Sequence, residues 1–532
     1  MLNRFESIAI TVALLVLANT SFALAETKAT PVPNLVAQAT PSPSPTKKPG
    51  LTWRVPIRAY DFTRQNASNT GQNAANKAIN QWGFNLGILP HVEYDNIWKG
   101  LLAGVTYVYA NPLNGCATPE QHLSPPCKAV VPHGQLPNGG TFNYDDTVPA
   151  FQLNTLMEAF VGWKDQKVYA KVGNQVINTP WAPASDTRIK PNAFQGIDAS
   201  YTFNSNWLIE GTDMVRYENR TASDFSRSTL ITSFAAGAAG IGSNIYNPGG
   251  QTIETSGYPM ARLGYTKGPV AANFWYYGFL QIANAYWLDA KYTFSEVPFH
   301  PFVAVQFGDE NNTGSAVVGK IDSQIYGVQG GINLPYGILI TAAYDDIPIR
   351  TDTITLPHGY KCGGANTISV GKVTESLPYF LPSGGTANCS KNTNGTTNIY
   401  YGGWASPYSD SYATDPIFTT SLTQGMADRR SPGQSYLARI TFSELNHQLV
   451  IYGSYAGYDY NNPGGAQATH EGDADLLFYL NKAPTANQLY RGFLFHYRYG
   501  ERTQSGSELP TPNGYGGSPL FKYNRFQFEY DI

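Results

Sequence analysis

Arginine residues recur on one parity of several alternating stretches of the chain. Arg439, Arg498 and Arg525 each lie among polar positions that alternate with apolar ones, and Arg54 and Arg58 share a parity near residue 50. A guanidinium presents a planar pair of N–H donors that matches a carboxylate. These residues could therefore bind anions reversibly. The alternative is that they are scattered charges near the ends of strands and bind no solute.

Two groups of charged residues accompany the arginines. Asp473 and Asp475 share one parity, either as an acidic counterpart to the arginines or at a rim of the structure. Asp186, Arg188 and Lys190 stand two residues apart in a segment that contains several prolines. If both signs of charge face a narrow aqueous passage, they create a transverse field that acts on charged solutes. The alternative is that Asp186 and Arg188 only pin their segment to a wall.

Motifs for catalysis and for metal binding are not found in the sequence. It contains neither G-x-S-x-G nor H-E-x-x-H, and its eight His have no metal-ligand spacing. Paired carboxylates for glycoside hydrolysis could hide among the 38 acids, but nothing supports a nucleophile. We expect no enzyme activity, no catalytic residue, no cofactor and no bound metal. The net charge of −3 also argues against a nucleic-acid partner.

The N-terminus predicts export. Residues 1–25 combine Arg4, an apolar core over residues 8–17 and an Ala23-Leu24-Ala25 cleavage site, which is typical of a signal peptide cleaved after Ala25. Residues 26–50 are rich in Pro and Ser and predict an extended linker. The remaining residues, 51–532, form the body of the protein.

The elements that must position the charged residues are strands. Charged residues make up only 14% of the chain, against about 25% in a typical soluble domain. From Leu51 onward the dominant signal has period two, which indicates strands rather than helices. At the C-terminus, for example, one face carries Phe526, Phe528, Tyr530 and Ile532 and the other carries Arg525, Gln527, Glu529 and Asp531.

Such alternation fits either a soluble sandwich, for example an adhesin, or a transmembrane barrel. Three features favour the barrel: segments of about 9–12 residues, aromatic residues at the strand ends, and connections that alternate between short and long. We count about eighteen strands, or sixteen if two are miscounted, with short turns such as residues 90–97 on one side. The fold prediction is an all-β, antiparallel transmembrane β-barrel in the outer membrane. Its partners would be outer-membrane lipid and the barrel-assembly machinery, which reads an aromatic-alternating last strand.

The four cysteines fall into two local pairs. Cys116 and Cys127 lie in one predicted long loop, and Cys362 and Cys389 lie in another. In an exported chain this arrangement predicts two loop-closing disulfides, because neither pair has the spacing of a zinc site.

Short motifs in a fixed order resemble those of the OprD-type outer-membrane porins. They are Val172-Gly173-Asn174-Gln175, the segment from Asp186 through Arg188 to Pro191, and Phe194-Gln195-Gly196. Residues 313–323 and the strand pair that contains Asp473, Asp475 and Arg498 also look like this family. The chain departs from the family in its linker, its Cys pairs and the long loop after the thirteenth strand.

The resemblance implies an eighteen-stranded channel whose loop over residues 178–191 folds inward and forms an eyelet. Asp186, Arg188 and Lys190 would line the constriction. The lumen ladder would comprise Arg54, Arg58, Arg439, Arg498, Arg525, Asp473 and Asp475. Small water-soluble solutes, often carboxylates, would pass by passive diffusion, through a monomer or a trimer. The alternative is a general or carbohydrate-selective porin that uses lumen tyrosines.

Overall fold

The structure is a computed structural model that describes most of the barrel. The described residues are 50–67, 79–113, 142–144, 149, 152–185, 188–232, 252–314, 321–355, 360–362, 367–370, 373–376, 396–409, 414–429, 432–444, 447–460, 467–480, 492–505 and 520–532. The chain divides into two units, residues 1–34 and 35–532, and all described residues belong to the second. The predicted signal peptide and nearly all of the predicted linker lie outside the described residues.

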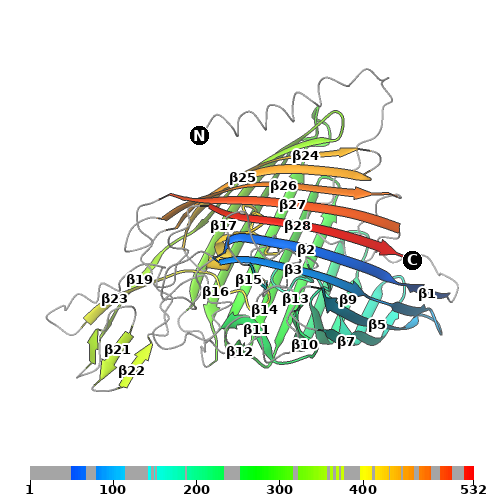
Figure 1. Ribbon diagram of the computed structural model, residues 1–532, viewed down its shortest axis with the longest axis horizontal. Helices are drawn as coiled ribbons and strands as arrows, with labels where there is room; N and C mark the ends of the chain where they lie inside the picture. The colour runs from blue at the N-terminus through cyan, green and yellow to red at the C-terminus, as the bar shows by residue number, and fades with distance from the viewer. Residues whose placement is uncertain are drawn as a thin grey trace. The chain divides into compact units, whose positions relative to one another are not determined.

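The second unit is built on a sheet of 21 strands that closes on itself. Eighteen of them cross the barrel wall, and each pairs antiparallel with its neighbours: β2 (Pro56–Ala67), β3 (Ile79–Ile88), β5 (Leu101–Pro112), β7 (Leu153–Lys164), β8 (Val168–Gln175), β9 (Ala193–Thr202), β10 (Trp207–Glu218), β13 (Tyr258–Lys267), β14 (Val270–Phe279), β15 (Ala283–Thr293), β16 (Phe302–Asn312), β17 (Asp322–Leu334), β18 (Ile338–Ile347), β24 (Gly433–Glu444), β25 (Leu449–Tyr460), β26 (Gln467–Tyr479), β27 (Gly492–Ser505) and β28 (Leu520–Asp531). The last strand, β28, pairs with the first, β2, and Phe62 lies opposite Arg525. This closure confirms the predicted eighteen-stranded barrel and leaves it without a free edge (Figure 1).

Three short strands complete the sheet: β1 (Gly50–Arg54), β4 (His91–Asp95) and β6 (Phe142–Tyr144). The first two continue β2 and β3 past a break, because β1 pairs with β4 and β4 pairs with β5. The prediction of a turn over residues 90–97 is therefore wrong, because most of this stretch forms strand β4. Pro90 has no N–H and interrupts the ladder, and the chain reverses at residues 96–100, where the Asn96 side chain accepts a hydrogen bond from the Gly100 N–H at 2.8 Å.

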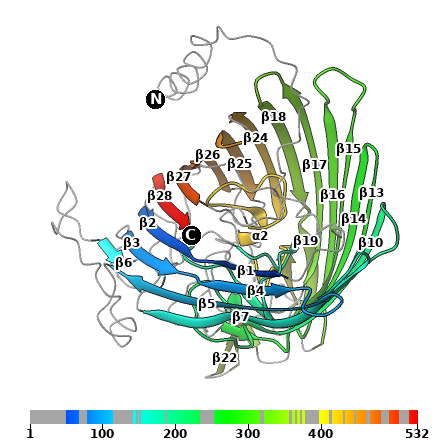
Figure 2. The same cartoon turned by 90° about the vertical axis from the view of Figure 1, so that its right-hand side faces the viewer.

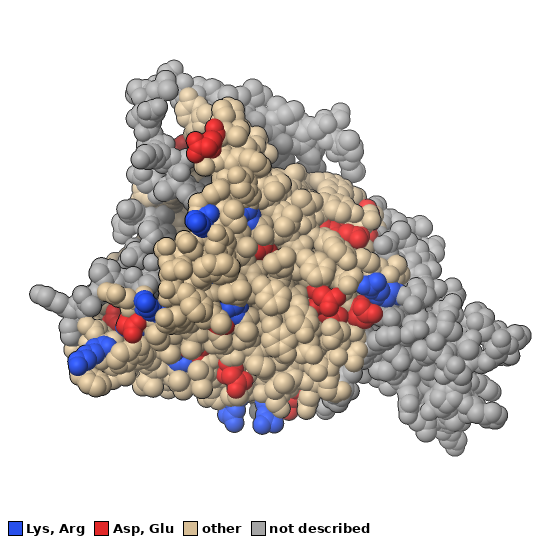
Figure 3. Space-filling model, turned by 180° about the vertical axis from the view of Figure 1, so that it is seen from behind, with Lys and Arg blue, Asp and Glu red and all other residues tan. Residues whose placement is uncertain are grey.

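The two faces of the wall differ as the period of two predicts. In β5, Leu101, Val105 and Tyr107 are exposed on the outside, and the even-numbered residues from Leu102 to Ala110 point inward and are buried. The outer face shown in Figure 3 carries few charged side chains. An apolar outside over a polar inside is what a barrel in a bilayer requires. Among the described residues, no helix has the length and apolar character to cross a membrane.

Two stretches of loop fold into the barrel. The first inner segment, residues 176–192, joins β8 to β9. The second inner segment, residues 402–427, belongs to the long connection between β18 and β24 and runs into α2 (Met426–Arg429), which Figure 2 shows within the ring of strands. Most described side chains of the first segment and nearly all of those of the second are buried. We had predicted only the first of them to fold inward.

Besides the strands of the wall, short strands pair with one another in the long connections. The pairs are β11 (Ser228–Thr232) with β12 (Thr252–Glu254), β19 (Arg350–Thr355) with β23 (Thr396–Tyr401), and β20 (Tyr360–Cys362) and β22 (Val373–Ser376) on either side of β21 (Thr367–Val370). Cys362 ends β20, but its side chain is not described, and Cys116, Cys127 and Cys389 lie outside the described residues. The two disulfides stay predictions.

Candidate lumen site

The arginines of the last two strands are cross-strand neighbours on the inner face of the barrel wall. Arg498 of β27 lies directly opposite Arg525 of β28, which in turn lies opposite Phe62 of β2. The register places these three residues in one row that runs around the inside of the barrel. The parity read from the sequence thus brings Arg498 and Arg525 together on the inner face.

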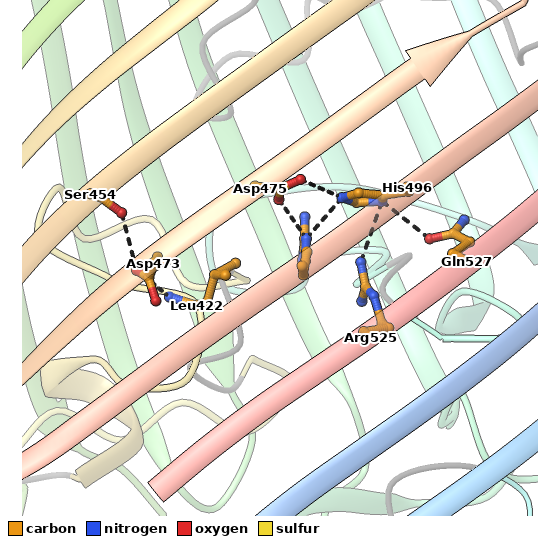
Figure 4. A network of polar contacts seen from close by, with 8 residues as sticks. Leu422, Ser454, Asp473, Asp475, His496, Arg525 and Gln527 are labelled. Carbon is orange, nitrogen blue, oxygen red and sulfur yellow. Dashed lines mark hydrogen bonds and ion pairs between the residues drawn. The ribbon is translucent and has the colours of Figure 1, made fainter. Parts of the chain in front are cut away.

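Asp475 binds one of these guanidiniums and a neighbouring histidine. Its Oδ2 lies 2.6 Å from Arg498 Nε, and its Oδ1 lies 2.7 Å from His496 Nε2 (Figure 4). The carboxylate is fully buried. It therefore offsets the charge of Arg498 and holds both side chains in place.

Arg525 lies on the other side of the histidine. Its Nη2 is 3.5 Å from His496 Nδ1, which also lies 3.2 Å from Gln527 Oε1 (Figure 4). The guanidinium lies 5.6 Å from the centre of the Tyr60 ring. This is cation–π geometry.

The other predicted ladder arginines also point inward. Arg58 Nε lies 2.9 Å from Glu529 Oε2, and both side chains are buried. Arg439 lies 4.8 Å above the Tyr452 ring. Arg54 continues the parity of Arg58 into β1. Three further inward arginines were not among our candidates: Arg64, Arg262 and Arg502.

The first inner segment packs against β2 and β3. Arg188 is fully buried and lies 4.7 Å from the centre of the Phe62 ring. The neighbouring Ile189 sits so close to Gly87 that a Cβ at that position would lie 2.7 Å from Ile189 Cγ1. The absence of a side chain at Gly87 thus lets the segment touch the wall. Arg188, Phe62 and Arg525 therefore belong to the same region of the lumen.

Lys190 points to another partner. Its Nζ lies 3.1 Å from Glu218 Oε1 and donates to the Asn219 carbonyl at 2.7 Å. Burial lowers the pKa of Lys190 to about 8, although the Glu218 carboxylate acts in the opposite direction. The contact ties the first inner segment to the end of β10. Asp186, the third predicted eyelet residue, lies outside the described residues.

The second inner segment contacts both the first inner segment and the wall. Trp404 packs among Trp181 of the first inner segment and Trp287 of β15, with ring centres 4.8 and 6.1 Å away. Asp473, which we had considered as a lumen acid, accepts a hydrogen bond from the Leu422 N–H at 3.3 Å and one from Ser454 at 3.1 Å (Figure 4). This carboxylate therefore holds a loop instead of standing open to solvent.

A signal for the second inner segment is present in the sequence but was missed. The stretch contains Trp404, Tyr408, Phe418, Leu422 and Met426, which are apolar residues that an exposed loop would not need. His496 was missed as well, although it shares the parity of Arg498. Glu471 shares the parity of Asp473 and could have been found in the same way.

No protein-family model and no curated protein sequence matches the chain. Solved structures of similar fold do. OpdK of Pseudomonas aeruginosa, crystallised with vanillate, aligns with a TM-score of 0.56 at 10% identity over 91% of this chain and 98% of that one. OccK2 (OpdF) of the same organism, in complex with glucuronate, aligns with a TM-score of 0.56 at 10% identity, over 90% of this chain and 98% of that one. A BenF-like porin of Pseudomonas fluorescens Pf-5 aligns with a TM-score of 0.60 at 10% identity, over 91% of this chain and 98% of that one.

These alignments span nearly the whole of each porin and about nine tenths of this chain. The eighteen strands, the closure of β28 on β2 and the inward first segment were established above without them. The resemblance inferred from the sequence motifs is confirmed at the level of the fold. The chain has the fold of the OprD-type outer-membrane porins.

Proposed function

We propose that the protein is an outer-membrane channel through which small water-soluble solutes that carry a carboxylate diffuse passively. The observation that carries the proposal is the row of inward guanidiniums, Arg498 and Arg525, beside Arg188 and the Phe62 ring. An anion loses hydration water in a narrow passage, and fixed positive charge replaces the lost stabilisation. Paired guanidiniums favour carboxylates in particular, because their N–H donors match the two carboxylate oxygens.

The similar structures support the choice of solute class. Two of them hold vanillate and glucuronate, and both of these compounds are carboxylates. Nothing in the proposal requires a cofactor, energy coupling or a chemical step. Export through a signal peptide cleaved after Ala25, insertion by the barrel-assembly machinery and a monomeric or trimeric state are parts of the same proposal.

Within the eyelet the three predicted residues receive different roles. We propose that Arg188 contributes to the positive region through its place beside Phe62. Lys190 instead anchors the first inner segment, because its amino group is fully buried against Glu218. Asp186 keeps the predicted role of a lining acid.

Uptake of a matched pair of solutes tests the proposal. Glucuronate and glucose have similar size and differ mainly in one carboxylate. Proteoliposomes containing the refolded chain should swell faster in glucuronate, with the counter-ion gradient collapsed by an ionophore. Arg525→Gln should slow glucuronate and leave glucose unchanged. Equal rates would indicate a general diffusion porin, and faster glucose would indicate a carbohydrate-selective one.

A further inference from the structure

Four carboxylates of the inner wall bind backbone N–H groups of one loop. They project from β16, β18 and β26 and meet the second inner segment. The contacts are Ala405 N to Glu310 Oε2 at 2.7 Å, Thr419 N to Asp345 Oδ2 at 2.8 Å, Thr423 N to Glu471 Oε1 at 2.7 Å and Leu422 N to Asp473 Oδ2 at 3.3 Å.

Each of these acids is removed from solvent. Glu310, Asp345 and Glu471 are at most 1% exposed, and Asp473 is 8% exposed. Glu471 makes a second contact, in which its Oε2 accepts from the Thr423 hydroxyl at 2.7 Å. What sets these carboxylates apart from the arginine row is that each of them accepts hydrogen bonds from the backbone of the second inner segment.

The loop needs such acceptors because most of it forms no regular structure. A buried N–H group without a partner is costly, and in a strand the neighbouring strand would supply the acceptor. At Ala405, Thr419, Leu422 and Thr423 the wall supplies it instead. Tyr458 acts in the same way, since its hydroxyl accepts from Ser421 N at 3.0 Å and donates to the Thr419 carbonyl at 2.7 Å.

The contacts spread over a wide arc of the wall. They begin at Trp287 on β15, include Asp345 on β18 and Tyr458 on β25, and end at Arg502 on β27, whose Nη1 donates to the Thr423 carbonyl at 3.4 Å. The segment is therefore fastened at many points across the lumen. Because α2 and the segment that leads into it lie within the ring of strands, they occupy part of the lumen (Figure 2).

We infer that Glu310, Asp345, Glu471 and Asp473 are positioning residues that hold the second inner segment across the lumen and so set the size limit of the channel. They fix the loop and do not serve as an acidic counterpart that contacts the solute. The inference rests on the proposed channel function and adds to it the residues that determine the size limit. The competing role, acids that line the solute path, predicts a different response to substitution.

Glu471→Ala and Glu471→Ala/Asp473→Ala separate the two roles in planar-bilayer recordings. Glu210→Ala is the matched control, because Glu210 is an inner-face acid that binds Arg262 at 3.1 Å and neither inner segment. Loss of the anchors should raise the single-channel conductance and admit larger neutral polymers, with little change in reversal potential. An unchanged polymer cut-off together with a shift toward anions would overturn the inference and favour acids that line the path.

A second readout does not depend on conduction. Ser421 is fully buried, so a Ser421→Cys chain should react slowly with a membrane-impermeant maleimide. Removing a buried acceptor should raise that rate about tenfold or more in the Glu471→Ala background but not in the Glu210→Ala background. The chain without the added cysteine gives the background, and heat-modifiable migration on gels shows that each variant has folded.

The two readouts separate failure of the inference from failure of the proposed function. If no preparation conducts but labelling rises only with Glu471→Ala, the channel proposal fails and the positioning role stands. If wild-type protein conducts but neither polymer cut-off nor labelling responds to the double variant, the positioning role is wrong and the channel proposal stands.

Discussion

Trp181 of the first inner segment and Trp404 of the second lie against each other with ring centres 4.8 Å apart and planes tilted by 31°. Both rings are fully buried. The two loops that narrow the lumen therefore share one aromatic contact, although 223 residues of sequence separate them. A Cβ at Gly308 of β16 would lie 2.8 Å from Trp404, so the wall leaves room for this ring by omitting a side chain.

Trp404→Ala should loosen both inner segments at once. Removing a buried Trp side chain destabilises its surroundings by roughly 3–5 kcal/mol in packed cores. Single-channel recordings should therefore show more frequent transitions to a larger conductance than in the wild type. Trp98→Ala is the control, because Trp98 is 65% exposed at a turn. Equal transition frequencies in the two variants would show that the contact does not couple the loops.

Asp475→Asn should increase the preference for anions. The carboxylate offsets the charge of Arg498 at 2.6 Å, and its amide would keep the shape but remove the negative charge. Reversal potentials in a salt gradient should shift toward the anion equilibrium potential. Asp61→Asn serves as the control. The Asp61 side chain accepts a hydrogen bond from the Trp82 indole N–H of the neighbouring strand at 2.7 Å, and it lies on the outer face, between the inward Tyr60 and Phe62. An unchanged reversal potential in Asp475→Asn would contradict the assignment of Arg498 to the solute path.

Lys190 should make docking of the first inner segment depend on alkaline pH. Its pKa is about 8 in the docked segment, against an ordinary value of 10.5. Docking therefore releases a proton between these two values, and raising the pH across that window favours the docked segment by up to about 1.4 kcal/mol per pH unit. Below pH 8 Lys190 is protonated in both states, so it adds no pH dependence to the free energy of docking.

The measurement for Lys190 is the time spent at the lower conductance level. That dwell time should lengthen between pH 8 and 10 in the wild type and in Lys167→Met, a control in an exposed turn. It should lose its pH dependence in Lys190→Met. If the dwell time still lengthened with pH in Lys190→Met, a titrating group other than Lys190 would be responsible.

The sequence predicted the wall of the barrel because the signal for a strand face is local. In β28, the alternation of Glu529 and Tyr530 alone tells which side chain points to the lumen and which to lipid. The same parity placed Arg498 and Arg525 on the inner face. Strand count and the even closure followed from the lengths of segments and turns.

The interior could not be predicted in the same way. The contact of Arg188 with Phe62 and that of Thr423 with Glu471 join residues far apart in sequence, and no local period encodes them. Lys190 shows the consequence, because spacing grouped it with Arg188 while the fold turned it toward Glu218. For the second inner segment, its aromatic content was the available sign, whereas its place in the long loop after the thirteenth strand did not indicate that it folds inward.

The reversal potential across a planar bilayer in a salt gradient tests the central claim most directly. Discrete current steps with anion preference are expected in the wild type, and a clear loss of that preference is expected in Arg498→Gln/Arg525→Gln. Arg216→Gln, a change of an exposed residue on the outer face of β10, should retain the preference. Discrete steps whose reversal potential is the same in all three proteins would contradict the role of the arginine row and leave a non-selective pore.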